Sequence, residues 1–203
     1  MSRSLYSPSD HHDACGVGFV ATLTNLPTHE IVRQGLEVLV RLDHRGAIGA
    51  DGQTGDGCGI TVQIPDAFFH AVASTAGVEL PAQGDYALGT LFLDPDTLEA
   101  QRRTVEAVLE DESLPLLWWR EVPVEGSVPG PIARQSQPAV VQIVVGKPEG
   151  IERGAAFERA LYIARRRIER ALESRQAGVA NGHVTSLSSQ TATYKGMLTP
   201  AQL

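Results

Sequence analysis

Two cysteines, Cys15 and Cys58, are the side chains of this sequence best suited to act as nucleophiles. A thiol has a pKa of about 8.5, and its thiolate attacks carbonyl carbons readily once a base accepts the proton. An α-amino group titrates at about 7.7 to 8.0, so a cysteine at a chain's N-terminus carries such a base on its own residue. Gly16 and Gly18 follow Cys15 and would let a substrate approach the backbone closely. Cys15 is therefore a candidate N-terminal nucleophile, although an isolated cysteine is more often a small buried residue.

The same region holds several potential metal ligands, namely His11, His12, Asp13, Cys15 and Cys58. Their local spacing contains neither CxxC nor HExxH, which zinc sites commonly use. We therefore predict no metal site. The glycine-rich run over residues 55–59 lacks the Lys-Ser/Thr pair of a phosphate-binding loop, which favours a tight structural loop.

The composition is that of an ordinary globular protein: 203 residues, 42% hydrophobic, with a net charge of -7. A negative net charge does not favour nucleic acid or an anionic membrane surface as partners. No apolar run approaches the roughly 20 residues of a membrane span, and residues 1–14 lack the apolar core of a secretory signal. We expect a cytoplasmic protein whose two cysteines stay reduced.

Hydrophobic periodicity predicts the elements that must position these residues. Strands are expected over residues 17–23, 59–64, 86–93, 118–122, 139–145, 184–188 and 193–197, and helices over residues 28–43, 65–69, 94–111 and 157–172. A long glycine-rich loop is expected over residues 43–59, and a second loop over residues 126–138. Strands and helices occur in clusters, which favours a layered α+β domain with largely antiparallel sheets. Thr199 followed by Pro200 is typical of a helix start, and Leu203 comes only a few residues later. Because natural chain ends rarely fall just inside an element, this suggests a fragment of a longer polypeptide.

Four segments carry a family resemblance: CGVGFVA from Cys15, GLEVLVRLDHRGA, ADGQTGDGCGITVQIP and SLSSQTATYKGML. In this order they resemble the start of the class II glutamine amidotransferase domain of glutamate synthase large subunits, from about Asp13 to Leu203. The resemblance implies an N-terminal-nucleophile hydrolase fold, a four-layer αββα sandwich that would be incomplete at the C-terminal end. It also implies a propeptide of residues 1–14, cut at the Ala14–Cys15 bond, and an amidotransferase domain over residues 15–203.

The chemistry that the resemblance implies is hydrolysis of L-glutamine to L-glutamate and ammonia through a thioester on Cys15. In whole enzymes of this kind the ammonia feeds reductive amination of 2-oxoglutarate, with flavin mononucleotide and an iron-sulfur cluster at a distant site. No cofactor is expected in this segment. The implied partners are the remainder of a large subunit and a small subunit, with no nucleic acid and no membrane.

Arg45 and Gly46 match the HRG element that lies beside the nucleophile in this family, and on the sequence alone a helix-ending turn with a surface arginine is the alternative. Cys58 stands where the family usually has a small residue and is interpreted as core filling. Asn181-Gly182 does not fit the family's oxyanion motif, so the oxyanion donors and glutamine carboxylate ligands are expected beyond Leu203. The isolated chain is therefore predicted to be inactive. The rival hypothesis is an amidotransferase-like binding or regulatory module that never matures.

Overall fold

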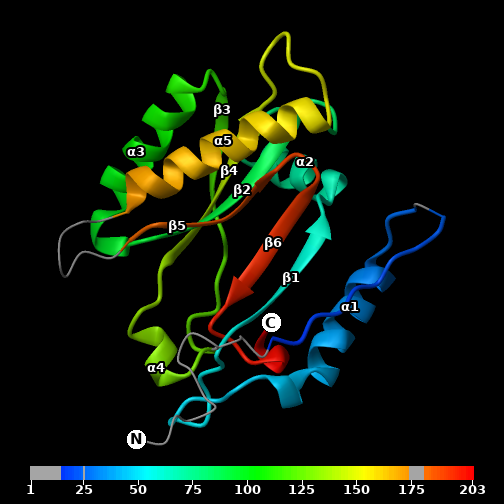
Figure 1. Ribbon diagram of the computed structural model, residues 1–203, viewed down its shortest axis with the longest axis vertical. Helices are drawn as coiled ribbons and strands as arrows, with labels where there is room; N and C mark the ends of the chain where they lie inside the picture. The colour runs from blue at the N-terminus through cyan, green and yellow to red at the C-terminus, as the bar shows by residue number, and fades with distance from the viewer. Residues whose placement is uncertain (1–14, 25, 174–180) are drawn as a thin grey trace, which may run out of the picture.

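The structure, a computed structural model, describes residues 15–24, 26–173 and 181–203 (Figure 1). Its strands are β1 (Cys58–Gln63), β2 (Tyr86–Leu93), β3 (Leu116–Glu121), β4 (Ala139–Gly146), β5 (His183–Ser188) and β6 (Thr191–Gly196). Its α-helices are α1 (His29–Arg41), α2 (Asp66–Thr75), α3 (Leu98–Asp111), α4 (Pro131–Arg134) and α5 (Ala155–Leu172). Short 3-10 helices are η2 (Asp43–Arg45), η3 (Pro95–Thr97) and η4 (Pro200–Gln202).

The strands form two antiparallel sheets, as the sequence predicts. The larger has the order β3-β4-β2-β5, and the smaller pairs β1 with β6. β2 and β4 lie in the centre of the larger sheet and are buried on both faces, which explains why their sequences are nearly continuous apolar runs. The molecule is thus a mixed α/β structure built on antiparallel sheets.

One face of the four-stranded sheet is covered by α3 and α5 (Figure 1). The apolar positions of α5 recur at intervals of three and four, so that Phe157, Leu161, Ala164, Ile168 and Leu172 all turn inward and are buried. They pack against the sheet side chains that point to this face, including Leu91 and Ile143. This layer is the main hydrophobic core.

The other face of the sheet packs against α2 and the β1–β6 pair. A second hydrophobic cluster joins Phe69 and Ala73 of α2 with Tyr86, Val144 and Ala192. The opposite face of β1, which carries Thr61 and Gln63, is exposed. α1 lies beside β1, where a Cβ placed on Gly35 would come 3.1 Å from Cδ1 of Ile60.

The structure corrects the sequence prediction at several elements; α2, predicted to end at residue 69, runs to Thr75. Residues 17–23 do not form a strand, because no strand of the described ranges pairs with them; Val17, Phe19 and Leu23 are almost fully exposed. The predicted loop over residues 126–138 contains α4. The helix predicted to run to residue 43 ends at Arg41, and the chain continues as η2.

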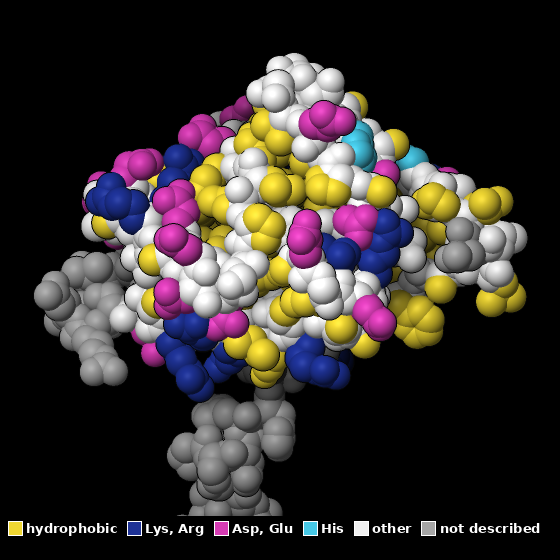
Figure 2. Space-filling view, turned by 90° about the horizontal axis from the view of Figure 1, so that it is seen from above, with side chains coloured by type: hydrophobic (Ala, Val, Ile, Leu, Met, Phe, Trp, Pro, Cys, Tyr) yellow, Lys and Arg dark blue, Asp and Glu magenta, His cyan; other side chains and the backbone are white. Residues whose placement is uncertain are grey.

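Acidic and basic side chains alternate with apolar ones on the face that Figure 2 presents, and neither sign of charge forms a continuous patch there. No helix among the described residues has the length and apolar character needed to cross a bilayer.

Candidate active site

Cys15 is an exposed thiol, and the segment that follows it runs against the C-terminal half of α1. A Cβ placed on Gly16 would lie 3.2 Å from Cβ of Arg45 and 3.3 Å from a methyl carbon of Leu42, and one on Gly18 only 2.4 Å from a methyl carbon of Val38. A separation of 2.4 Å is shorter than real carbon contacts, so a side chain at position 18 would push the segment away from the helix. Both glycines therefore let the backbone beside Cys15 lie close to α1 and Arg45.

Arg45 reaches this position because the chain tightens at the end of α1. The backbone N–H of Arg45 donates to Leu42 O at 2.8 Å, and that of Gly46 donates to Asp43 O at 3.0 Å, which closes η2. Gly46 then leaves in an extended conformation, and a Cβ placed on it would lie 3.3 Å from Oδ1 of Asp56. The structure thus places the HRG turn directly beside the residue that follows Cys15. The catalytic roles of Cys15, Arg45 and Gly46 stay predictions.

The glycine-rich segment after Gly46 folds back on itself as a hairpin over residues 47–56, which we call the 47–56 hairpin. Asp56 N donates to Ala47 O at 3.0 Å, and Gly49 N donates to Thr54 O at 2.7 Å. Ile48 and Gly55 form an isolated antiparallel bridge. The hairpin returns the chain to β1 and holds Asp56 beside Gly46.

Asp51 and Thr54, which the sequence analysis did not single out, tie the tip of this hairpin to α4. The Asp51 carboxylate accepts from Thr54 N at 2.8 Å, from the Thr54 hydroxyl at 2.6 Å and from Ile132 N at 3.0 Å. The Thr54 hydroxyl accepts in turn from Ala133 N at 3.2 Å. Two orphan N–H groups at the start of α4 are therefore satisfied by side chains from a distant loop.

These hydrogen bonds favour the ionised form of Asp51. They lower the pKa of its carboxyl far below the usual range, with the Thr54 hydroxyl as the largest cause and the backbone N–H of Ile132 next. The only sequence signal for this contact is an aspartate three residues before a threonine in a glycine-rich turn, and that signal does not identify α4 as the partner.

The C-terminal segment also contacts the 47–56 hairpin. The side-chain amide of Gln202 donates to Gln53 O at 3.2 Å and to Val128 O at 3.0 Å. A Cβ on Gly55 would lie 2.2 Å from Leu198 O, so only glycine fits there. Thr199 and Gln202 form the capping box that begins η4, where the sequence predicts a helix start.

Cys58 is less suited to react than Cys15. It begins β1 opposite Gly196 and is partly buried. Burial raises the pKa of its thiol, and the negative charges of Asp56 and Asp43 raise it further, which disfavours the thiolate. Cys58 belongs to neither hydrophobic cluster, so its interpretation as core filling stays a prediction.

Residues 1–14 lie outside the described residues. The expectations for His11, His12 and Asp13, and for cleavage between Ala14 and Cys15, therefore stay predictions. Within residues 15–24, 26–173 and 181–203, no group of three His, Cys, Asp or Glu side chains is placed to hold a metal ion. A surface groove of about 620 Å³ lies elsewhere, along β3 between α2 and α3, and neither Cys15 nor Arg45 lines it.

The chain belongs to the class II glutamine amidotransferases, because the model of that family matches residues 15–203. The match begins at Cys15 itself. The chain is therefore an amidotransferase domain, which is a component of an enzyme.

Large chains of glutamate synthase are similar to it over its whole length. The NADPH-type large chain of Bacillus subtilis is 41% identical over 207 residues, and that of Azospirillum brasilense is 39% identical over 206 residues; both alignments cover 100% of this chain. The ferredoxin-dependent glutamate synthase 2 of Synechocystis is 39% identical over 191 residues, 93% of this chain. The chain spans only 12 to 13% of the length of these relatives.

Proposed function

We propose that this domain is the glutaminase portion of a glutamate synthase and that Cys15 is its nucleophile. The observation that carries the proposal is that the family match begins at Cys15, an exposed cysteine whose next residue lies against Arg45. Removal of residues 1–14 would turn the Cys15 nitrogen from an amide into a basic amine.

In the proposed reaction the Cys15 amine accepts the thiol proton while sulfur bonds to the carboxamide carbon of L-glutamine. The tetrahedral intermediate then collapses, the carbon–nitrogen bond breaks, and the amine returns the proton to the departing ammonia. A γ-glutamyl thioester remains on Cys15. Water attacks its carbonyl carbon, L-glutamate leaves, and the thiol is restored.

We assign Arg45 and Gly46 to the surroundings of the nucleophile rather than to the bond-making steps. The close approach of Gly16 to Arg45 supports this assignment, because it brings the HRG turn to the backbone that follows the thiol. The oxyanion donors and the groups that hold the glutamine backbone are assigned to residues beyond Leu203, so the 203-residue chain alone is expected to release little or no ammonia.

The fold we propose is the αββα sandwich of N-terminal-nucleophile hydrolases. Three of its layers have counterparts here: the α3 and α5 layer, the four-stranded sheet, and the β1–β6 sheet packed behind it. The exposed face of β1 at Thr61 and Gln63 is where we expect the remaining helical layer, supplied by polypeptide that follows this region in longer relatives.

Because the relatives are glutamate synthases, we further propose that the ammonia serves reductive amination of 2-oxoglutarate elsewhere in a longer polypeptide. Flavin mononucleotide and an iron-sulfur cluster would belong to that other part. We also propose that a small subunit is a partner of the longer polypeptide and that the protein is cytoplasmic.

The deciding experiment combines mass and activity. The mature protein should lack the mass of residues 1–14, and a glutamine-like diazo ketone should label Cys15. In a polypeptide extended through the rest of the domain, Cys15→Ser should abolish ammonia release, whereas the matched Cys58→Ser variant should retain it. Normal glutamine hydrolysis by a protein that keeps its leader, or by the Cys15→Ser variant, would refute the mechanism. An intact leader with no hydrolysis at all would favour a binding module instead.

A further inference from the structure

The outer edge of β3 is open to hydrogen bonding. β3 is the last strand in the order β3-β4-β2-β5 and pairs with β4 alone. Beyond its end, Val122 N donates to Val140 O at 3.1 Å. Backbone groups alternate in direction along an antiparallel pair, so those of Trp119 and Glu121 point away from β4. Across the described ranges, no strand pairs with them on that side.

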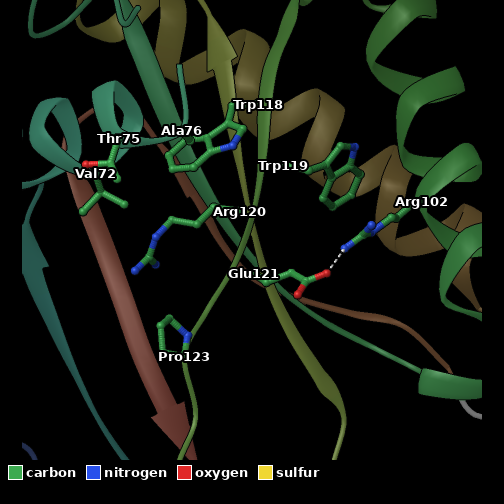
Figure 3. A pocket seen from close by; sticks show the side chains of 9 residues that line it. All are labelled: Val72, Thr75, Ala76, Arg102, Trp118, Trp119, Arg120, Glu121 and Pro123. Carbon is green, nitrogen blue, oxygen red and sulfur yellow. Dashed lines mark hydrogen bonds and ion pairs between the residues drawn. The ribbon is translucent and has the colours of Figure 1, made fainter. Parts of the chain in front are cut away.

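The open edge lies at the floor of the groove of about 620 Å³ (Figure 3). Trp118 and Arg120 point toward α2 on one face of β3, whereas Trp119 and Glu121 point toward α3 on the other. The wall on the α2 side is formed by Val72, Thr75 and Ala76, and Pro123 closes one end. The groove therefore has a mostly apolar wall on the α2 side and the Arg102–Glu121 ion pair on the α3 side, and an unused row of backbone donors and acceptors runs along it.

Arg120 gives the groove a fixed positive charge. Its Nη1 donates to Oε1 of Gln142 at 2.6 Å, and its guanidinium carbon lies 5.7 Å from the ring centre of Phe68. Gln142 is fully buried and donates from Nε2 to Thr90 Oγ1 and Tyr194 Oη, both at 3.3 Å. The position of the guanidinium is thus fixed by a hydrogen bond to a buried side chain. Among the described residues, no carboxylate forms an ion pair with it, whereas its neighbour Glu121 pairs with Arg102 at 3.4 Å.

A second copy of this chain does not supply the missing carboxylate. If two β3 edges paired antiparallel about a two-fold axis, the side chains facing Arg120 would come from the same face of the other β3. That face carries Trp118, Arg120 and Val122, none of which is acidic. A register centred on Arg120 would set two arginines opposite each other.

We propose that the β3 edge receives an extended acidic segment as a fifth, antiparallel strand of the sheet, with a carboxylate of that segment bound to Arg120. Strand addition would satisfy the outward backbone groups of Trp119 and Glu121 and pair the charge of Arg120. The source to which we commit is the part of a longer polypeptide that follows this region, because the relatives contain about eight times its length and a tether raises the local concentration of such a segment. The inference is independent of the chemistry at Cys15.

The first test uses a defined probe on the 203-residue chain. In an antiparallel strand the residue facing Arg120 precedes the one facing Trp118, so the probe is the peptide acetyl-Thr-Glu-Thr-Val-Thr-amide. It should shift the amide NMR signals of Trp119 and Glu121 and change tryptophan fluorescence, with a dissociation constant on the order of 1 mM. Replacing its glutamate by glutamine should weaken binding about tenfold, and so should Arg120→Gln. Arg103→Gln, at an exposed arginine of α3, should not.

The peptide comparison leaves the protein unchanged, so it decides the role of the carboxylate even if Arg120→Gln disturbs folding. Equal affinity for the glutamate and glutamine peptides, or no shift at Trp119 and Glu121, would overturn the proposal.

The second test addresses the source of the segment. In a polypeptide that continues to the length of the relatives, the Trp119 and Glu121 amides should exchange with deuterium at least about tenfold more slowly than in the 203-residue chain. The probe should no longer bind, because the edge is occupied. Equal exchange in the two proteins, or unchanged binding of the probe, would reject the tethered segment as the occupant.

Discussion

Replacing Gln142 by leucine should destabilise the fold strongly although the two side chains are similar in size. Gln142 is fully buried and joins β4 to Arg120 on β3, to Thr90 on β2 and to Tyr194 on β6. It thereby links both sheets to the charged side chain at the β3 edge.

The size of the effect follows from the three hydrogen bonds. The bond from the Arg120 guanidinium is short and has a charged donor, which contributes about 1.5 to 3 kcal/mol. The bonds to Thr90 and Tyr194 are long, at 3.3 Å, and contribute about 0.5 kcal/mol each. Leucine leaves little cavity, so the expected loss in unfolding free energy is about 2.5 to 4 kcal/mol.

Urea unfolding followed by tryptophan fluorescence measures this loss. With a denaturant slope of about 2.5 kcal/mol per molar, the midpoint should fall by about 1 to 1.5 M at an unchanged slope. Thr90→Val is the matched control: it removes one weak bond at a site that is 1% exposed and should cost only about 0.5 kcal/mol. A loss below about 1 kcal/mol for Gln142→Leu would show that these bonds do not stabilise the fold, and the proposed holding of Arg120 would fail with them.

Three further outcomes are expected. Gly55→Ala should lower the unfolding free energy by more than about 2 kcal/mol in urea unfolding, because its Cβ would lie 2.2 Å from a carbonyl oxygen. Burial first, then Lys195, lowers the pKa of His183; its NMR titration midpoint should lie below about 6.5 and rise in Lys195→Met. Its stabilising contribution should be complete above pH of about 6.5 and decline as the pH falls through the lowered pKa. Iodoacetamide should modify the exposed Cys15 faster than Cys58, whose thiol pKa is raised, as peptide mass analysis would show.

The sequence predicted elements well where burial alone determines them. The strand predicted over residues 86–93 has the observed bounds of β2, because an apolar run buried on both faces carries its own signal. The helix predicted over residues 157–172 was equally clear, because its apolar positions from Phe157 to Leu172 recur at intervals of three and four. These are short-range patterns, and they need no knowledge of distant residues.

The sequence did not predict features that depend on residues far along the chain. The alternation over residues 17–23 predicts a strand, but a strand also needs a neighbour to pair with, and the structure provides none among the described residues. α4 is a single turn between two proline-containing loops, and its first N–H groups are capped by Asp51 and Thr54. For the candidate site, the family resemblance pointed to Cys15, Arg45 and Gly46, but the Asp51 contacts could be found only in three dimensions.

The link between the 47–56 hairpin and α4 bears on how the protein matures during synthesis. Asp51 and Thr54 bind Ile132 and Ala133, which lie 81 and 79 positions later, so these two bonds cannot form until that part of the chain has left the ribosome. The contact between the 47–56 hairpin and α4 is consequently completed late, after more than half of these 203 residues have been made.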